Sequence, residues 1–354
     1  IVEKRSCFEV SYLGISSMKH LVLALCLFAT QAVATPVEVT VQGPAGLLAG
    51  TIEIPQSTSR AAALILPGSG PTDRNGNNPQ GLFAASYRLL AEDLASQGIT
   101  TLRFDKRGIG ASQGDPDDVT LSEFAEDATA WIAELLRQTE QDCVWLLGHS
   151  EGAIIATMLA EREDVCGIAL IAAPGRNVGD LFREQVASQP LIAPFAQAFD
   201  TALGEFAAGG SPDLSTLHPG LHSVFAPQTA RYMRDLIAAN PGQLLAATTA
   251  PVIILHGDGD VQAPPSEADP LVAARPDAEA HVLSGMTHVL KRAIPRSQAP
   301  NNEAFTQASL ATYADPNAPL HDDLVPLLVQ FVTGSAPADV APDQTPTPVQ
   351  QESK

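Results

Sequence analysis

A serine flanked by glycines carries the clearest signal for chemistry in this chain. Ser150 stands at the centre of GHSEG (residues 148–152), between a strand-like run, VWLL, and a helix-like run, GAIIATML. In a strand–turn–helix setting this spacing puts the serine on a strained turn, where small flanking residues avoid collision and the helix N-terminus supports negative charge. The context predicts that Ser150 is a nucleophile rather than part of a structural turn.

A serine hydroxyl needs a base within hydrogen-bond reach, and the base needs a group that holds it in the right tautomer. In this arrangement both come later in the chain, in the order serine, acidic residue, histidine. The run PVIILHG is followed by Asp258 and Asp260, and the run AEAHVLSG is followed by His288. Because open parallel sheets place their sites at the carboxyl ends of strands, His288 is predicted as the base and one of the two aspartates as the acid.

The other histidines fit the role of base less well. His149 lies inside the turn and is expected to face the packed sheet, while His256 and His281 lie within strand-like runs. We interpret all three as structural histidines. The remaining ones follow no strand-like run: His218, His222 and His321.

Apolar runs of strand length alternate with helical segments along most of the chain and must position these residues. The runs cover residues 61–66, 99–104, 144–148, 165–173, 251–257 and 278–285. Runs buried on both faces and alternating with helices predict an α/β fold with a parallel sheet. Residues 37–42 and 47–55 alternate in polarity and predict an N-terminal antiparallel hairpin. Helices are predicted over residues 86–98, 121–138 and 321–334, the last starting or kinking at Pro326.

The predicted domain organisation is discontinuous. The connection from Ala173 to Pro251 is far longer than an ordinary α/β connection and contains short helical patches. We therefore expect a core over residues 35–175 and 250–334, with a helical cap over residues 176–249 inserted between them. Residues 335–354 are rich in Pro, Thr and Gln and are expected to be a disordered tail.

Residues 1–34 are excluded from the predicted fold. Lys19 and His20 precede a short apolar run that ends in Ala32-Val33-Ala34, as a secretory signal peptide does. The run is shorter than a bilayer span requires. We expect cleavage after Ala34 and a secreted or periplasmic protein without a membrane anchor, and we interpret residues 1–17 as upstream sequence.

Five motifs, in order, resemble the α/β-hydrolase superfamily and most closely its bacterial esterase and serine-aminopeptidase-like branch, whose members usually carry a helical cap. They are LPGSGPTDRNG (66–76), FDKRGIGAS (104–112), GHSEG (148–152), LHGDGD (255–260) and GMTH (285–288). The resemblance spans residues 60–334 and implies Ser150 as nucleophile, Asp260 as acid and His288 as base. It also implies an oxyanion hole built from the backbone N–H groups of Ser69 and Glu151. Pro67-Gly68 replaces the usual His-Gly ahead of that hole, which depends on backbone donors and is expected to survive the change.

Two further expectations concern charged residues and cysteines. Arg74, in the loop that enters the oxyanion region, is interpreted either as the ion-pair partner of Glu151 or, with Glu151, as a solvated charge at the rim. Asp105 and Arg107 are expected to belong to an ion-paired structural turn. In the superfamily resembled, the strands that begin at Cys143 and Cys166 are neighbours, so a disulfide between them is expected in an oxidising compartment.

Composition narrows the classes of partner. A net charge of −20 argues against nucleic acid and anionic membrane surfaces. No cofactor and no metal is expected. The resemblance implies a serine hydrolase, in the first place a carboxylesterase acting on a small-molecule ester with a small or medium acyl group. A peptidase or amidase, a thioesterase or a lipase would use the same three residues, and a non-catalytic binding protein on this scaffold is the alternative from another class.

Overall fold

The computed structural model describes residues 35–334. The predicted signal peptide, residues 1–17 and the predicted tail over residues 335–354 lie outside the described residues. Within residues 35–334, no helix is long and apolar enough to cross a membrane.

The central sheet has eight strands in the order β1-β2-β6-β3-β7-β8-β9-β10. β1 (Thr35–Gly43) and β2 (Gly46–Ile54) form an antiparallel hairpin at one edge, and β2 pairs antiparallel with β6. The remaining strands pair in parallel: β3 (Ala61–Leu66), β6 (Ile99–Phe104), β7 (Val144–His149), β8 (Val165–Ile171), β9 (Val252–Gly257) and β10 (Glu279–Leu283). The predicted α/β class, with a mostly parallel sheet and an N-terminal hairpin, is confirmed.

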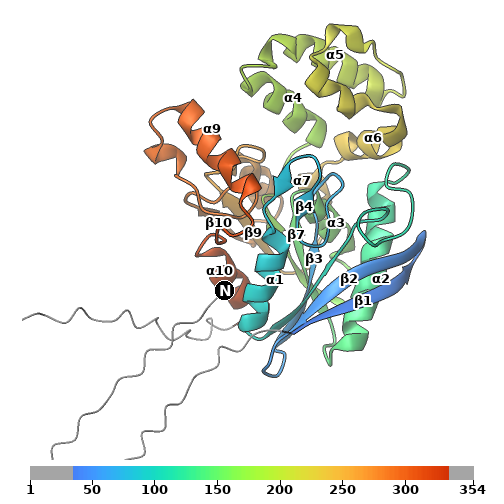
Figure 1. Cartoon of the computed structure of the whole chain (residues 1–354), viewed down its shortest axis with the longest axis vertical. Coiled ribbons are helices and arrows are strands. Elements are labelled where there is room, and N and C mark those ends of the chain that lie inside the picture. The colour runs from blue at the N-terminus through green and yellow to red at the C-terminus, as the bar shows by residue number, and fades with distance from the viewer. Residues whose placement is uncertain (1–34, 335–354) are drawn as a thin grey trace, which may run out of the picture. The chain divides into compact units, whose positions relative to one another are not determined.

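The inner strands are buried on both faces because helices cover both sides of the sheet (Figure 1). In β3, Leu64 and Leu66 join one apolar cluster, whereas Ala63 and Ile65 join the other. The first face is covered by α2 (Leu121–Gln138) and α3 (Glu151–Leu159), the second by α1 (Ser86–Ser96) and α10 (Leu324–Thr333). Burial on both faces explains why these strands are continuous apolar runs in the sequence.

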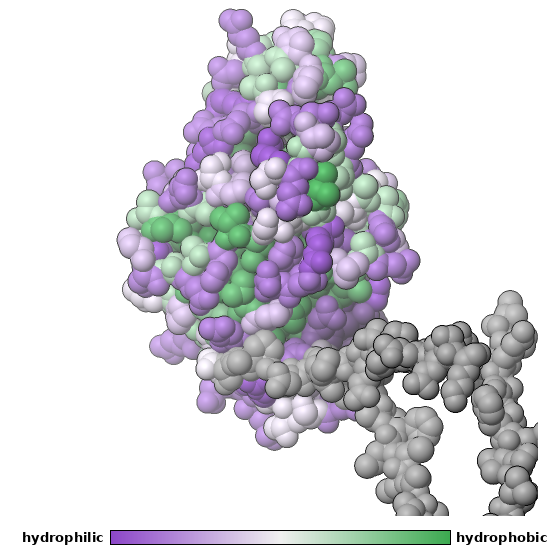
Figure 2. Space-filling view, turned by 90° about the vertical axis from the view of Figure 1, so that its left-hand side faces the viewer, coloured by the Kyte–Doolittle hydropathy of each residue, from purple (hydrophilic) through white to green (hydrophobic). Residues whose placement is uncertain are grey.

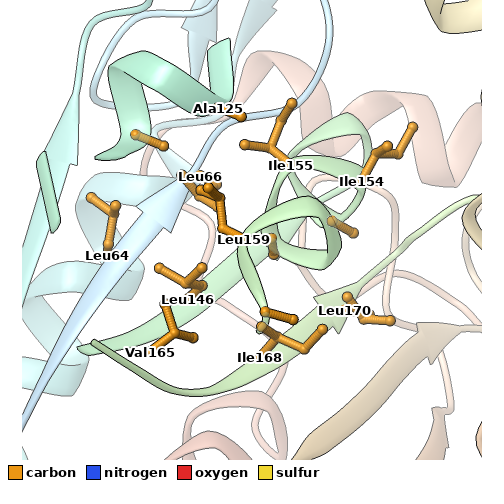
Figure 3. Packing of buried hydrophobic residues seen from close by; sticks show 14 of the residues in the cluster. Leu64, Leu66, Ala125, Leu146, Ile154, Ile155, Leu159, Val165, Ile168 and Leu170 are labelled. Atoms are coloured by element: carbon orange, nitrogen blue, oxygen red, sulfur yellow. The ribbon is translucent and has the colours of Figure 1, made fainter. Parts of the chain in front are cut away.

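α3 packs on the strands that lead to it and follow it. Its apolar residues Ile154 and Leu159 lie in one buried cluster with Leu146 of β7 and Ile168 of β8 (Figure 3). Close packing of this kind resists displacement of the helix. The turn between β7 and α3, which carries Ser150, is therefore held from both sides.

The chain leaves the sheet between β8 and β9 and forms the helical insert (residues 176–249). Its α-helices are α4 (Val178–Ser188), α5 (Ala196–Ala207), α6 (Ala230–Ala238) and α7 (Pro241–Leu245). α4, α5 and α6 lie together, apart from the layers of the sheet (Figure 1). The insert has an apolar cluster of its own, in which the ring of Phe225 lies 5.7 Å from that of Phe199 and 5.4 Å from that of Phe206.

Several elements differ from the sequence prediction. α10 begins at Leu324, later than expected, and Pro326 lies in its first turn, where a missing N–H costs no helical hydrogen bond. Three features had not been predicted: the short β4 (Asn77–Asn78) and β5 (Leu82–Phe83) ribbon, α8 (Ala268–Ala274) and α9 (Asn302–Ala311).

The described surface mixes polar and apolar residues. On the face shown in Figure 2, hydrophobic residues reach the surface in areas bordered by hydrophilic ones, as is usual for a folded protein. Leu191 of the helical insert is the most exposed large apolar side chain in the described part of the chain, at 75%.

Cys143 and Cys166 form a disulfide, with their Cα atoms 5.3 Å apart. Val144 and Val165, which begin β7 and β8, are paired in the parallel sheet. Cys143 directly precedes β7 and Cys166 is the second residue of β8, so the two cysteines lie side by side. The expected bond is confirmed. It joins positions 23 residues apart in the chain and fixes the amino end of the strand that leads to Ser150.

Removing this disulfide is expected to lower the free energy of unfolding by about 2–4 kcal/mol, because the crosslink restricts the unfolded chain. Urea unfolding of protein beginning at Thr35, compared with the double variant Cys143→Ser/Cys166→Ser, measures the difference. Two free thiols in the denatured, unreduced protein, or equal stability of the two proteins, would contradict the expectation.

Candidate active site

Ser150 occupies a strained turn at the end of β7. Its backbone has φ 53° and ψ −119°, a region that side-chain-bearing residues rarely adopt, and its N–H donates to the Ile171 carbonyl at 2.9 Å. A Cβ atom at Gly152 would lie 2.2 Å from the Leu66 carbonyl oxygen, and one at Gly148 would lie 2.4 Å from the Gly152 carbonyl oxygen. Neighbouring backbone leaves no room for a Cβ atom at either flanking position, so only glycine fits there. The predicted turn is present, and this close packing explains its two glycines.

Asp260 and His288 are in direct contact. His288 Nδ1 lies 2.8 Å from Asp260 Oδ2, and both residues are buried. The other carboxylate oxygen, Oδ1, accepts hydrogen bonds from the N–H groups of Gln262 and Ala263 at 2.7 and 2.9 Å. Three donors therefore hold the Asp260 carboxylate in place. Because Nδ1 of His288 faces this carboxylate, Nε2 on the other side of the imidazole points away from it.

Asp258, the competing carboxylate, faces elsewhere. Its Oδ1 accepts from the Gly285 N–H at 2.5 Å, and its Oδ2 accepts from the Ser284 hydroxyl at 3.3 Å. Asp258 thus holds the loop that precedes His288, whereas Asp260 touches the imidazole itself. Of the two aspartates that the residues alone left open, the structure brings Asp260 to His288.

Ser150 and His288 line the same cavity, of about 80 Å³. Ser69, in the loop after β3, and Glu151, the first residue of α3, line it as well. In the part of the chain that the structure describes, the backbone N–H groups of these two residues donate to no protein acceptor. Both donors remain available to an oxygen placed beside Ser150, as an oxyanion hole requires.

His149 connects three segments of the site through one run of hydrogen bonds. The Gly68 N–H donates to Tyr87 Oη at 2.8 Å, Tyr87 Oη lies 2.7 Å from His149 Nδ1, and His149 Nε2 lies 2.7 Å from the carbonyl oxygen of His288. Because a carbonyl only accepts, we assign the proton to Nε2, and Nδ1 then accepts from the tyrosine hydroxyl. His149 is a buried, satisfied histidine, as expected, and it ties the loop before Ser69 to the turn and to His288.

The partner of Glu151 is Lys106, not Arg74. Lys106 Nζ lies 2.9 Å from Glu151 Oε1, with only 6% and 2% of the two side chains exposed. The hydroxyl of Tyr232, from α6 of the helical insert, donates to Glu151 Oε2. Both interpretations made from the sequence, an ion pair with Arg74 and a solvated rim charge, are wrong for Glu151. A buried carboxylate needs such partners, since leaving it unpaired is costly.

Arg74 belongs to a different ion pair. It donates to Asp105 Oδ2 at 2.7 Å and also contacts Glu38. Burial opposes ionisation of Asp105, but hydrogen bonds from Arg74 and from the Ala111 N–H keep the pKa of this carboxyl below its usual value. The neighbouring Arg107 pairs with Asp127 at 2.9 Å. The ion-paired structural turn expected at Asp105 and Arg107 is therefore confirmed, and Arg74 is part of it rather than of the cavity.

The histidines in strands have structural positions. His281 of β10 lies 2.7 Å from Glu279 at the surface. His256 of β9 is fully buried and, among residues 35–334, neither ring nitrogen has a hydrogen-bond partner, which departs from the expectation of a satisfied core histidine. Burial lowers the pKa of His256 and keeps it neutral. Residues 35–334 contain no group of three His, Cys, Asp or Glu side chains that could hold a metal ion.

Sequence reasoning missed Tyr87, Lys106 and Tyr232. Lys106 stands inside the FDKRGIGAS motif, between Asp105 and Arg107, so its charge next to a buried turn is a usable signal. No sequence signal points to Tyr87 or Tyr232, because each reaches the site from a helix, α1 or α6, whose position is determined only by the tertiary fold.

Parts of the chain are similar in sequence to known proteins. Residues 83–212 match the family described as serine aminopeptidase, S33, a region that contains Ser150 and ends before Asp260. Esterase EstD of Thermotoga maritima is 29% identical over 230 residues, which cover 64% of this chain and 52% of that protein. Polyketide transferase af380 of Aspergillus fumigatus is 29% identical over 129 residues, 34% of this chain and 44% of that protein. The chain spans about half the length of the curated relatives it matches.

The fold has a counterpart among solved structures. The Pyrococcus furiosus esterase Pf2001 superposes with a TM-score of 0.50 at 17% identity, covering 72% of this chain and 84% of that one. The fold is that of an α/β hydrolase, and the family match and the esterase relative support the esterase-like branch of that superfamily.

The neutral state of His149 makes stability depend on pH. Burial lowers the pKa of His149 to about 3, against 6.5 for an ordinary histidine, so between these values the unfolded chain binds a proton that the folded protein does not. The stabilisation is complete above about pH 6.5 and is lost as the pH falls, by about 1.4 kcal/mol per pH unit from this residue.

Urea unfolding between pH 7 and pH 4 measures this dependence. The slope of unfolding free energy against pH is expected to be shallower by about that amount in His149→Gln, and unchanged in the control His281→Gln, whose ring is at the surface. Equal slopes in His149→Gln and the unsubstituted protein would rule out the assigned neutral state.

Proposed function

We propose that this protein is a serine hydrolase that cleaves carboxylic esters through an acyl-enzyme on Ser150. The observation that carries the proposal is the buried Asp260–His288 pair, whose imidazole lines the same small cavity as a serine on a strained turn. The family match and the esterase relative support a hydrolase of this kind.

The proposed reaction uses each group at a stated atom. His288 Nε2 takes the proton of Ser150 Oγ as this oxygen attacks the ester carbonyl carbon, and the N–H groups of Ser69 and Glu151 donate to the oxyanion. His288 returns the proton to the alcohol oxygen as the carbon–oxygen bond breaks. A water then attacks the acyl-enzyme, giving its proton to His288, which passes it to the departing Ser150 oxygen. Asp260 stabilises the imidazolium in both halves.

The cavity favours an ester over an aminoacyl substrate. A peptidase that binds a free amino terminus needs a carboxylate to accept it. Glu151 is the one acidic residue among those that line the cavity with Ser150, and its carboxylate is already bound by Lys106 and Tyr232; the exposed Asp117 lines only the adjoining, larger cavity. Occupied in this way, it offers no site to a substrate ammonium group. A thioesterase would use the same atoms, and a binding protein without catalysis would have no use for the strained serine.

Export to the periplasm or beyond is a second part of the proposal. It rests on the signal-peptide pattern over residues 19–34, and the Cys143–Cys166 disulfide supports it because such bonds persist in oxidising compartments. N-terminal sequencing of exported protein should begin at Thr35; a start at Met18 or Lys19 would refute the cleavage.

The roles of the acid, base and nucleophile predict a graded pattern of kinetic effects. Asp260→Asn keeps the shape of the side chain but favours the wrong imidazole tautomer, so kcat on a fast ester is expected to fall by about 10⁴. Asp258→Asn, the matched control, should change kcat little because Asp258 does not touch His288. Ser150→Ala and His288→Ala should each reach background, and their losses should not add.

Kinetics on one chromogenic ester, with each variant first shown to be folded by circular dichroism, measure this pattern. A near-normal kcat in Asp260→Asn together with collapse in Asp258→Asn would overturn the assignment of the acid. Activity that persists in Ser150→Ala would overturn the acyl-enzyme itself.

A further inference from the structure

A second, larger cavity adjoins the one that contains Ser150. Its volume is about 470 Å³, against about 80 Å³ for the small cavity. We call it the chamber; Pro71, Ile109, Phe124, Val224 and Met233 are among the residues that line it. Ser69, Phe182 and Leu236 line both cavities. A molecule held at Ser150 therefore meets the chamber directly beside the oxyanion loop.

The lining of the chamber suits an uncharged apolar group. Three charged residues line it: Lys106 is paired with Glu151, Arg107 is paired with Asp127, and Asp117 is exposed to solvent. Lys106 also lies with its Nζ 4.1 Å from the centroid of the Phe124 ring. Much of the remaining lining is aliphatic or aromatic. The volume falls within the range of sites that enclose small organic ligands, roughly 300–1,000 Å³, which the small cavity does not reach.

The position of His288 determines which half of an ester enters the chamber. The alcohol oxygen must take its proton from the imidazole, so the alcohol half has to lie on the side of His288. His288 lines the small cavity together with Gln262 and Ala263, and none of the three lines the chamber. With the alcohol half there, the acyl half extends past Ser69 in the other direction, toward the chamber.

We propose that the chamber is the acyl-binding subsite and that it takes uncharged, apolar acyl groups of medium length, such as hexanoyl and octanoyl, while the small cavity admits only a compact alcohol. The inference rests on the proposed esterase function. It names residues of the helical insert, Val224 and Met233 among them, as determinants of acyl length.

Two ester series test the proposal. In methyl esters from acetate to octanoate, whose alcohol half is compact, kcat/KM measured by acid release is expected to rise about two- to fourfold for each added methylene, as burial of apolar surface predicts. In alkyl acetates that lengthen the alcohol instead, kcat/KM should not rise, because the small cavity has no room for the chain.

Variants connect the selectivity to the chamber. Ala226 lines it from the helical insert, and Ala226→Trp is expected to lower the ratio of kcat/KM for octanoate to that for acetate at least tenfold. Gln228→Trp, at an exposed position of the same lining, is the second variant should the first fail to fold. The matched control is Leu191→Trp, on the exposed surface of the same insert, which should leave the ratio unchanged.

The outcomes distinguish a failure of the acyl subsite from a failure of the proposed esterase function. Suppose that ester hydrolysis is lost in Ser150→Ala. If kcat/KM then does not rise with acyl length, or rises with alcohol length in the alkyl acetates, the acyl subsite is wrong although the esterase function still holds. An unchanged octanoate ratio in both folded tryptophan variants leads to the same conclusion. If no ester in either series is cleaved faster than by Ser150→Ala, the proposed function fails and the subsite with it.

Discussion

Three segments distant in sequence must meet at Ser150, and a single buried imidazole connects them. His149 is connected through Tyr87 to the loop after β3, directly precedes Ser150 in the turn, and donates to the backbone of His288. The run of bonds is complete only when His149 is neutral, because its Nδ1 must accept. Burial enforces that state by holding the pKa of His149 far below its ordinary value. Desolvation of one side chain thus becomes a constraint on the relative positions of the loop with Ser69, the turn with Ser150 and the loop with His288.

The helical insert is attached to the same region by a second buried arrangement. Tyr232 reaches from α6 to Glu151, and Glu151 is held in turn by Lys106 from the turn after β6. A buried ion pair adds little net stability, but loss of one partner leaves an uncompensated charge and costs several kcal/mol. The arrangement therefore serves position rather than stability. It ties the insert to the residue that follows Ser150: Glu151 lines the small cavity, and its partners Lys106 and Tyr232 line the chamber.

Much of the core could be predicted from the sequence because its signals are local. The apolar runs of the strands follow from burial on both faces, and the GHSEG turn follows from steric limits at Gly148 and Gly152. The contact of Asp260 with His288 could be anticipated because both residues follow parallel strands that end at the same edge of the sheet. In each case neighbours along the chain, or the regular geometry of one sheet, determine the outcome.

The pairings around the site could not be predicted in the same way. Lys106 rather than Arg74 meets Glu151, and Tyr232 arrives from a helix far along the chain. The partner of each charged side chain depends on how the side chains are oriented in the packed structure. The periodicity of the sequence carries no information on these orientations. The packing of the helical insert is likewise nonlocal, since its aromatic cluster gathers residues from several short helices. The acyl subsite proposed above is built from these parts, so the sequence indicates the chemistry more fully than the substrate.

The central claim is that Ser150 is an activated nucleophile, and covalent capture tests it most directly. After treatment of the folded protein with a fluorophosphonate, intact mass spectrometry and peptide mapping are predicted to show one adduct per chain, on Ser150. The adduct should be absent from Ser150→Ala and form far more slowly in His288→Ala, because the imidazole is needed to remove the proton. A folded protein that forms no adduct, or forms it on another residue, would contradict the account.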